Sequence, residues 1–455
     1  MKQILWILLC SVLSASCKKY LEAKPNDQLT TPNNITALQA LLDNGQYMNG
    51  CSPSSGQAAA DEFYLLQSTY DSRTSLVQQS YLWNMQGQSD YNFTNVKDWG
   101  NLYYSIYEAN VCLTEIDKIA KTTLNERQWD NVKGAAYFFR ARSFLQLAWV
   151  YCKAFNEQTA KQDMGIILRL NADFNSPSFR STVWNTYQQI IEDFKSAENY
   201  LPDLSPIPLR PSKAAVYGYL ARTYLSMREY DSAYKYSNTC LGIYDTLIDY
   251  NDATQVTPSD KFPFQDLNPE VIHQSYMNSV SINSISQKNA QIDTLLFDSY
   301  DNNDIRKSAF FSKTALGINF KGSYNARTAW FTGLTTAEMF LTRAECFARS
   351  GAISSAMADL NHLLESRWKK GTFSPLTALD KEDALNLILQ ERRKELLFRD
   401  LRWIDIKRLN LEGRNIAIKR IINGQEYVLA PNDNRFAIPL PTDIVSLTGI
   451  VQNTQ

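Results

Sequence analysis

Residues 217–240 read YGYLARTYLSMREYDSAYKYSNTC, and this stretch decides the fold class. Tyr217, Ala221 and Tyr224 recur at the spacing of one helical face, and Ala233 follows within a second periodic segment. A small alanine lets a neighbouring helix approach closely, while aromatic rings fill the groove beside it. The stretch therefore predicts two helices packed as a pair.

The same spacing occurs twice more along the chain. The copies are Phe340, Ala344, Phe347, Ile353, Ala356 and Leu363 and, for the first helix alone, Tyr137, Ala141 and Phe144. Repeated helix pairs of this kind are typical of tetratricopeptide repeats, which stack and bury a shared core. Long insertions separate the copies, so we do not expect one continuous stack. The alternative is that these segments are unrelated amphipathic helix hairpins.

Helical periodicity dominates most of the chain and predicts a mostly α-helical fold. The expected helices are 36–44, 98–120, 125–152, 181–201, 212–227, 231–243, 335–350, 352–366 and 381–409, which places helical repeats near 98–243 and 335–409. Between 245 and 334 the period weakens and Pro, Asn, Asp and Ser become frequent, which predicts long loops or short strands. Asn423-Gly424, among the short apolar runs of 416–440, predicts a β-hairpin.

The chain is close to neutral, with 46 Lys and Arg against 47 Asp and Glu in 455 residues. Because no basic or acidic run is present, nucleic acid is not an expected partner. Aromatic residues make up 12%, with 25 tyrosines and nine tryptophans, alongside many Asn, Gln and Ser. This mixture suits polar, uncharged ligands, and it suits ordinary helix packing equally well.

The N-terminus has the features of a bacterial lipoprotein signal. Lys2 is followed by the apolar run ILWILLCSVL at 4–13 and by the small residues at 14–16. That run is too short to span a bilayer, so we expect 1–16 to be an export signal. Cys17 would then carry the lipid, and 17–35 would tether a single domain at 36–455. Ser14 stands where such signals usually have Leu, and the alternative is an ordinary secretory signal.

The other cysteines and acidic clusters give no sign of a metal site. Beyond Cys10 and Cys17 five cysteines remain, which are Cys51, Cys112, Cys152, Cys240 and Cys346. Four of these five lie in apolar helical stretches. An odd number leaves at least one thiol free, and we expect buried thiols rather than a disulfide framework. The acidic cluster at 298–304 lacks the spacing of a calcium loop and predicts a solvated turn.

Four stretches resemble the SusD/RagB family, in the family's order and across nearly the whole chain. The first is Cys17-Lys18-Lys19-Tyr20-Leu21-Glu22 with Pro25, and the second is Trp99-x3-Tyr103-x2-Ile106-x2-Ala109-Asn110 followed by 135–141 (AAYFFRA). The third is 337–345 (AEMFLTRAE). The fourth, which is the most specific, is 391–396 (ERRKEL) with Arg402-Trp403-x-Asp405-x-Lys407-Arg408, before Ile438-Pro439-Leu440-Pro441 and Gln452-Asn453.

The resemblance implies a tetratricopeptide-like helical scaffold with a loop-rich, ligand-binding remainder. It implies an outer-membrane lipoprotein at the cell surface that binds a nutrient and hands it to a SusC-like TonB-dependent transporter. Ligands of the family are usually glycans or oligosaccharides and sometimes peptides. No cofactor and no catalytic activity are implied.

The candidate ligand contacts are aromatic residues in segments without a helical period. Residues 78–95 read QQSYLWNMQGQSDYNFTN and contain Tyr81, Trp83 and Tyr91. An aromatic face stacks on the C–H face of a sugar, while neighbouring amides bond its hydroxyl groups. By the resemblance, the comparable residues in the later loops are Tyr300, Tyr324 and Trp330. The alternative is that these rings pack the loops onto the scaffold, as we expect for Trp99 and Tyr103.

The charged block at 391–408 favours a structural interpretation over a catalytic one. Lys394 can reach Glu391 and Arg402 can reach Asp405 on one helix, with Trp403 as an apolar anchor. We therefore expect a partly buried ion-pair network. His273 and His362 are the only histidines, and no GxSxG or HExxH motif is present. A glycan-degrading enzyme with paired carboxylates and a tetratricopeptide scaffold without a small ligand remain the competing function classes.

Overall fold

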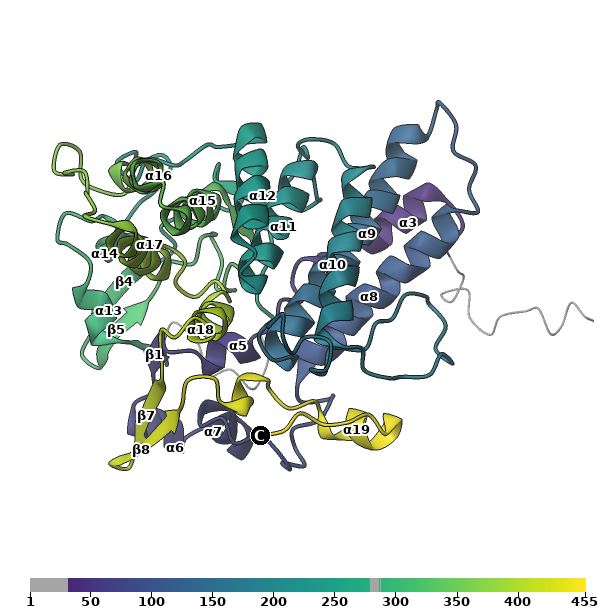
Figure 1. Cartoon of the computed structure of the whole chain (residues 1–455), viewed down its shortest axis with the longest axis horizontal. Coiled ribbons are helices and arrows are strands. Elements are labelled where there is room, and N and C mark those ends of the chain that lie inside the picture. The colour runs from purple at the N-terminus through teal and green to yellow at the C-terminus, as the bar shows by residue number, and fades with distance from the viewer. Residues whose placement is uncertain (1–31, 279–285, 287) are drawn as a thin grey trace, which may run out of the picture.

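The computed structural model describes residues 32–278, 286 and 288–455 and is mostly helical (Figure 1). The long helices agree with the predicted ones to within a few residues, apart from the last. They are α8 (Lys97–Ile116), α9 (Glu126–Tyr151), α10 (Val183–Glu198), α11 (Lys213–Met227), α12 (Tyr230–Ile243), α15 (Thr336–Ser350), α16 (Ile353–Glu365), α17 (Lys381–Glu395) and α18 (Arg402–Asn410).

The predicted repeats are the helix pairs α11–α12 and α15–α16. Ala221, Ala233, Ala344 and Ala356 are fully buried where the helices meet, which confirms their packing role. The expectation that insertions would interrupt the stack was wrong, because α12 packs directly against α15 although 244–335 lie between them. The insertion folds beside the stack, so the repeats share one core.

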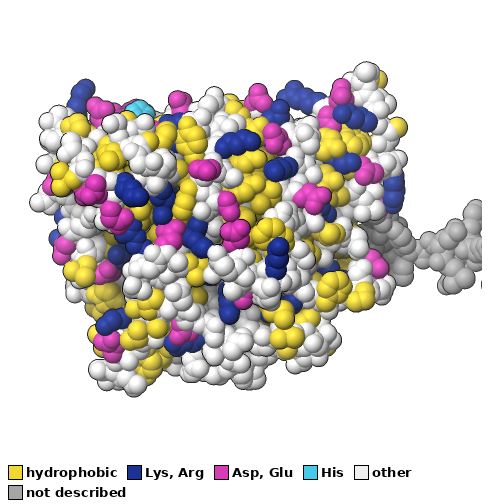
Figure 2. Space-filling view, viewed as in Figure 1, with side chains coloured by type: hydrophobic (Ala, Val, Ile, Leu, Met, Phe, Trp, Pro, Cys, Tyr) yellow, Lys and Arg dark blue, Asp and Glu magenta, His cyan; other side chains and the backbone are white. Residues whose placement is uncertain are grey.

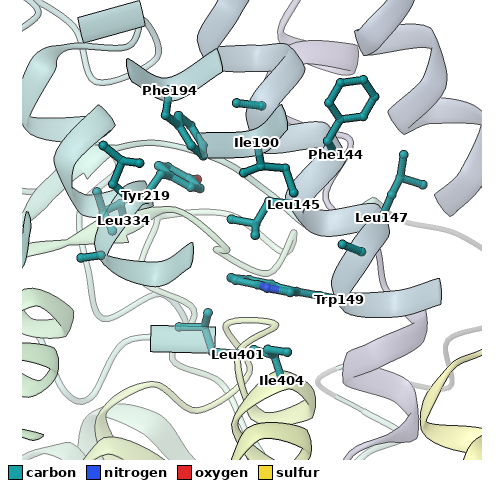
Figure 3. Close-up of a cluster of buried hydrophobic side chains, with 14 of the residues drawn as sticks. Phe144, Leu145, Leu147, Trp149, Ile190, Phe194, Tyr219, Leu334, Leu401 and Ile404 are labelled. Carbon is teal, nitrogen blue, oxygen red and sulfur yellow. The ribbon is translucent and has the colours of Figure 1, made fainter. Parts of the chain in front are cut away.

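That core is drawn in Figure 3, where side chains of α9, α10, α11 and α18 converge. Leu145 and Leu147 of α9 are fully buried, as are Ile190 and Phe194 of α10. The face of α9 that meets α18 adds Trp149, near Leu401 and Ile404 (Figure 3). The same apolar cluster therefore ties α9, α10 and α11 to α18, which lies much later in the sequence.

The region predicted to be loops or short strands contains short strands and a second core. A sheet of order β1-β3-β5-β4 joins β1 (Phe63–Tyr64), β3 (Gln291–Ile292), β5 (Gly317–Phe320) and β4 (Phe311–Thr314), with antiparallel pairing throughout. Nearby are β2 (Val271–His273), β6 (Leu334–Thr335), α13 (Thr294–Asp298) and α14 (Arg306–Phe310). Phe264, Phe310 and Phe320 belong to an aromatic-rich cluster separate from the main core.

Short elements from the two ends of the chain lie side by side at the bottom of Figure 1. They are α5 (Ser55–Ala59), α6 (Gln67–Asp71), α7 (Ser75–Tyr81), β7 (Ile418–Ile422), β8 (Gln425–Leu429) and α19 (Thr442–Thr448), while α3 (Ile35–Leu42) and α4 (Gly45–Met48) pack on α8. The β7–β8 hairpin confirms the prediction at Asn423-Gly424. Both turn residues have positive φ, 51° and 76°, as a type I′ turn requires.

The helix predicted over 381–409 is broken between α17 and α18. Phe398 and Asp400 both adopt left-handed backbone conformations, with φ of 58° and 60°. The Phe398 N–H donates to Glu62 Oε2 and the Asp400 N–H donates to Gln57 Oε1. Buried side chains far away in the sequence thus replace the helical hydrogen bonds, which helical periodicity alone does not reveal.

The charged block at 391–408 forms a buried ion-pair network, which confirms the structural interpretation. Lys394 bonds Glu391 at 2.6 Å, as predicted. Arg402 does not pair with Asp405, however. It bonds Asp61 instead, and Asp405 accepts from Arg392 and Arg408 at 2.8 Å each. Trp403 is the buried anchor beside Phe436, with 4.7 Å between ring centroids.

Candidate functional site

A pocket of about 450 Å³ lies where α6, α7, the β7–β8 hairpin and the chain's last residue meet. Its size falls in the range usual for small-molecule sites. The lining combines aromatic rings with amides and one guanidinium: Tyr70, Gln79, Leu82, Trp83, Asn84, Gln86, Tyr427, Arg435 and Gln455. In Figure 2 the surface over this part of the molecule carries fewer charged side chains than the upper part.

Two half-buried tyrosines from distant parts of the chain form the walls of the pocket. Tyr70 lies on α6, and its carbonyl accepts from Gln78 Nε2 at 3.0 Å. The Asn423 N–H at the hairpin tip donates to Gln67 Oε1 at 2.7 Å, which fixes β8 and Tyr427 beside α6. Partial burial raises the pKa of Tyr70, and the electrostatic influence of Tyr427 raises it further. The Tyr70 phenol is therefore neutral near pH 7 and can stack or donate.

The floor of the pocket is Trp83, held from below by Arg420 of β7. The Trp83 Nε1–H donates to the carbonyl of Ala59 at 3.0 Å. The Arg420 guanidinium lies 5.4 Å from the Trp83 ring and 4.1 Å from the Tyr81 ring. It also donates to the carbonyls of Ala60 and Phe63, so one buried cation joins the hairpin to the segment before β1. The floor is therefore rigid.

Uncharged hydrogen-bonding groups surround the two rings. Asn84 Nδ2 donates to Gln79 Oε1 at 2.8 Å, which leaves the Gln79 amide N–H groups and the Asn84 carbonyl for a ligand. Within the described chain, the Gln86 amide has no hydrogen-bond partner. Arg435 donates to Asp433 through Nε and Nη2, and its guanidinium also lines the pocket. Donors and acceptors around aromatic walls are the groups that recognise a polyol ring.

Two other cavities in the described residues have a different chemistry. A larger one, of about 820 Å³, is bordered by Lys369, Lys370 and His362 on and after α16, with Phe373 as its aromatic ring. A cavity of about 290 Å³ beside α9 is lined by arginines and prolines. Unlike these two, the pocket at Tyr70 and Tyr427 combines several aromatic rings with amides, which makes it a candidate site for a neutral polar ligand.

The structure places the first three predicted contacts in packing positions. Tyr81, Trp83 and Tyr91 are exposed by 2% or less. Tyr81 Oη accepts from the Leu65 N–H, and the Tyr91 hydroxyl donates to the carbonyl of Pro439 at 2.9 Å. Of the three, only Trp83 borders the pocket. Ligand contact by Tyr81 and Tyr91 stays a prediction, without an exposed ring face to support it.

The three predicted contacts in the later loops are buried as well. Tyr300 donates to the carbonyl of Lys394 at 2.8 Å, and Tyr324 bonds Glu270. Trp330 lies between Phe320 and Phe398, with ring centroids 5.3 and 5.1 Å away. Tyr300 and Trp330 thus pack the loop-rich region onto residues 391–408, and Tyr324 packs within that region, as in the alternative interpretation. Their absence from a helical period reflects irregular backbone, which can be as deeply buried as a helix.

Tyr70 and Tyr427 are the site residues that sequence reasoning missed. Tyr70 lies a few residues before the stretch 78–95 that was predicted to contact ligand, and nothing in the sequence distinguishes it from its buried neighbours. Tyr427 lies in β8, where the alternation of side chains places it with Leu429 on the face of the hairpin that packs against the fold, opposite Arg420 of β7. The alternation in β8 could have been read from the sequence. The contact between α6 and β8, whose tyrosines are 357 positions apart, could not.

The five cysteines in the described part of the chain are free and buried, as expected for buried thiols. Cys17 and the predicted signal peptide lie outside the described residues. In the ranges the structure covers, no helix combines the length and the apolar character that crossing a membrane requires.

Stacked helix pairs with a loop-rich unit beside them define a helical-repeat protein of the tetratricopeptide type. Residues 19–225 match the family model described as "Starch-binding associating with outer membrane". Residues 270–441 match the model of the SusD family. The two matches together cover most of the chain, and the chain belongs to the SusD/RagB family.

A curated relative and solved structures are also similar to this chain. SusD-like protein P2 of Formosa agariphila is 24% identical over 421 residues, which cover 78% of this chain and 79% of that protein. A putative sugar binding protein from Bacteroides vulgatus superposes with a TM-score of 0.73 at 18% identity, over 93% of this chain and 99% of the other. A structure described as a laminarin binding SusD-like protein gives a TM-score of 0.64 at 18% identity, with the same coverage. The structural likeness confirms the fold.

Proposed function

We propose that the protein binds a neutral glycan in the pocket at Tyr70 and Tyr427 and delivers it to a SusC-like TonB-dependent transporter. In this proposal the mature chain is held at the cell surface of the outer membrane by a lipid on Cys17. It acts as a binding subunit and catalyses no reaction.

The lining of the pocket carries the proposal. Two half-buried phenol walls offer apolar faces for the C–H faces of a sugar, and the amides of Gln79, Asn84 and Gln86 offer bonds to its hydroxyl groups. Glucans are the first ligands to test, because the matching family model is described as starch-binding and one similar structure as laminarin binding.

The same lining favours binding over glycan hydrolysis. Hydrolysis by the common mechanism needs two carboxyl groups on either side of the scissile bond. Among the residues described, no Asp or Glu lines this pocket. A bound glycan would therefore meet groups that hold it but, among the residues described, no carboxyl group that could protonate its glycosidic oxygen.

The proposal is tested by native electrophoresis in gels containing soluble starch or laminarin. We expect the wild-type protein to be retarded in at least one of them, and the glycan recovered after overnight incubation to be unchanged in length. Migration of the wild type at the ligand-free rate in both gels would overturn the proposed ligand class. Shortened glycan would overturn the non-catalytic assignment.

A further inference from the structure

A row of solvent-exposed aromatic rings crosses the outer face of α8, apart from the residues that line the pocket. The row consists of Tyr47, Phe93, Tyr104, Tyr107 and Phe174. Phe174 is 78% exposed, Phe93 is 45% exposed and Tyr104 is 40% exposed, and the other two are half-buried. The outer face of a helix in a soluble protein is normally polar, so these rings require a reason other than core packing.

The rings follow one another at close range. Tyr104 lies 4.1 Å from Tyr47 and 6.5 Å from Tyr107, measured between ring centroids. Tyr107 lies 4.7 Å from Phe174. Phe93 covers Gly100, one helical turn before Tyr104, where an added Cβ would collide with its ring. Tyr47, Tyr104, Tyr107 and Phe174 are therefore linked ring to ring, and Phe93 extends this strip over Gly100.

The strip is held in place by contacts beneath it. Asn110 Nδ2 donates to the carbonyls of Arg169 and Asn171, which ties the loop carrying Phe174 to α8. Arg169 braces that loop by donating to the Ser176 carbonyl and to Ser178 Oγ, each at 2.5 Å. A loop fixed in this way presents Phe174 without further ordering, which lowers the entropic cost of binding.

Uncharged amides lie beside the rings, together with the Glu108 carboxyl group, which bonds the Tyr104 phenol. Asn44 and Gln46 immediately precede Tyr47, and Asn101 lies on the same face of α8 as Tyr104. In the described chain, the amides of these three residues have no hydrogen-bond partner. The Tyr104 phenol stays neutral, because burial and a hydrogen bond with Glu108 raise the pKa of Tyr104 to about 12. Exposed rings next to unpaired amides match the alternating C–H faces and hydroxyl groups of a polysaccharide.

We propose that this strip is a second glycan-binding surface, which lies along a neutral glucan chain while the pocket holds one part of it. This inference rests on the proposed function, since it assumes that the ligand is a glycan. A long chain meets both surfaces and gains affinity from their combined occupancy, whereas a trisaccharide confined to the pocket does not.

The test compares two double variants that remove rings of similar exposure. Tyr104→Ala with Phe174→Ala shortens the strip. Tyr234→Ala with Phe179→Ala is the matched control, because these rings are 37% and 71% exposed and lie outside the strip. Each protein is run in gels containing soluble starch or laminarin, and it is titrated calorimetrically with maltotriose or laminaritriose. Melting curves verify that both variants fold.

The strip variant is expected to bind the polysaccharide about three- to tenfold more weakly for each ring removed. Its trisaccharide affinity, and both affinities of the control, should match the wild type. Unchanged polysaccharide affinity in a folded strip variant would overturn the inference and leave the strip for a protein partner. A pocket variant (Tyr70→Ala with Tyr427→Ala) that keeps trisaccharide affinity would contradict the proposed site but not the strip. A wild type that binds neither polysaccharide would overturn both.

Discussion

Arg402 and Asp61, which are 341 positions apart, form a two-pronged ion pair that joins α18 to the segment leading into β1. Arg402 Nε and Nη2 donate to the two carboxylate oxygens at 2.7 and 2.8 Å. The same segment supplies the carbonyls of Ala59 and Ala60, which bind Trp83 and Arg420 under the pocket. The ion pair therefore connects the floor of the pocket to the helical scaffold.

Arg402→Ala should lower the free energy of unfolding by about 1–3 kcal/mol, because it leaves Asp61 mostly buried with only Arg393 nearby, at 3.3 Å. Urea unfolding measures the change. Lys118→Ala, which breaks the exposed pair with Glu115, is the control and should cost about 0–1 kcal/mol. Equal effects of the two substitutions would show that the Arg402–Asp61 pair contributes no more than a surface pair.

Glu62 should make the protein less stable as the pH rises from about 5 to 7. Burial raises the pKa of Glu62 from 4.5 to about 7. The folded state then keeps a proton that the unfolded state releases in this window, so stability falls with increasing pH. Glu62→Gln should remove this slope, which is worth about 1–3 kcal/mol. Melting temperatures measured at several pH values test this, and an identical slope in the variant would exclude Glu62 as its source.

Trp330→Ala should destabilise the fold by about 3–5 kcal/mol, because the indole is buried between Phe320 and Phe398. Thermal melts of this variant and of Phe179→Ala, an exposed control, measure the difference. The opposite result, a normal melt together with weakened glycan binding, would return Trp330 to the role of ligand contact that the sequence suggested.

Cys17→Ala should move the protein from the membrane fraction to a soluble fraction. The motivation is the apolar run at 4–13, followed by small residues and a cysteine. Metabolic labelling with palmitate measures lipid attachment, and Cys10→Ala within the apolar run is the control that should keep the label. Label retained on the Cys17→Ala protein would disprove anchoring at this residue.

Local periodicity was enough to predict most of the fold. The helix pairs, their buried alanines and the Asn423-Gly424 hairpin all depend on residues close together in the sequence. The two fold errors share a cause, since the stacking of α12 on α15 and the break at Phe398 and Asp400 both depend on distant partners. The predicted pair of Arg402 with Asp405 was wrong for the same reason, because the true partner of Arg402, Asp61, lies outside the charged block.

The candidate site was predicted less well. The stretch 78–95 contributes Trp83 to the candidate pocket, yet burial separates Tyr70 from Tyr81 and Tyr91, and the sequence does not encode burial where the backbone is irregular. Tyr427 reaches the pocket only because Gln67 accepts from the hairpin tip at Asn423. Aromatic residues without a helical period therefore indicated where the chain is irregular, and not which rings face a ligand.

Calorimetric titration of the Tyr70→Ala, Tyr427→Ala double variant is the most direct test of the central claim. The titrant is maltotriose or laminaritriose, whichever binds the wild type more tightly, and Tyr234→Ala is the control with an exposed tyrosine elsewhere. We predict that the double variant melts like the wild type and binds at least about tenfold more weakly, since two stacking faces are lost. Wild-type affinity in the folded double variant would contradict the assignment of this pocket as the glycan site.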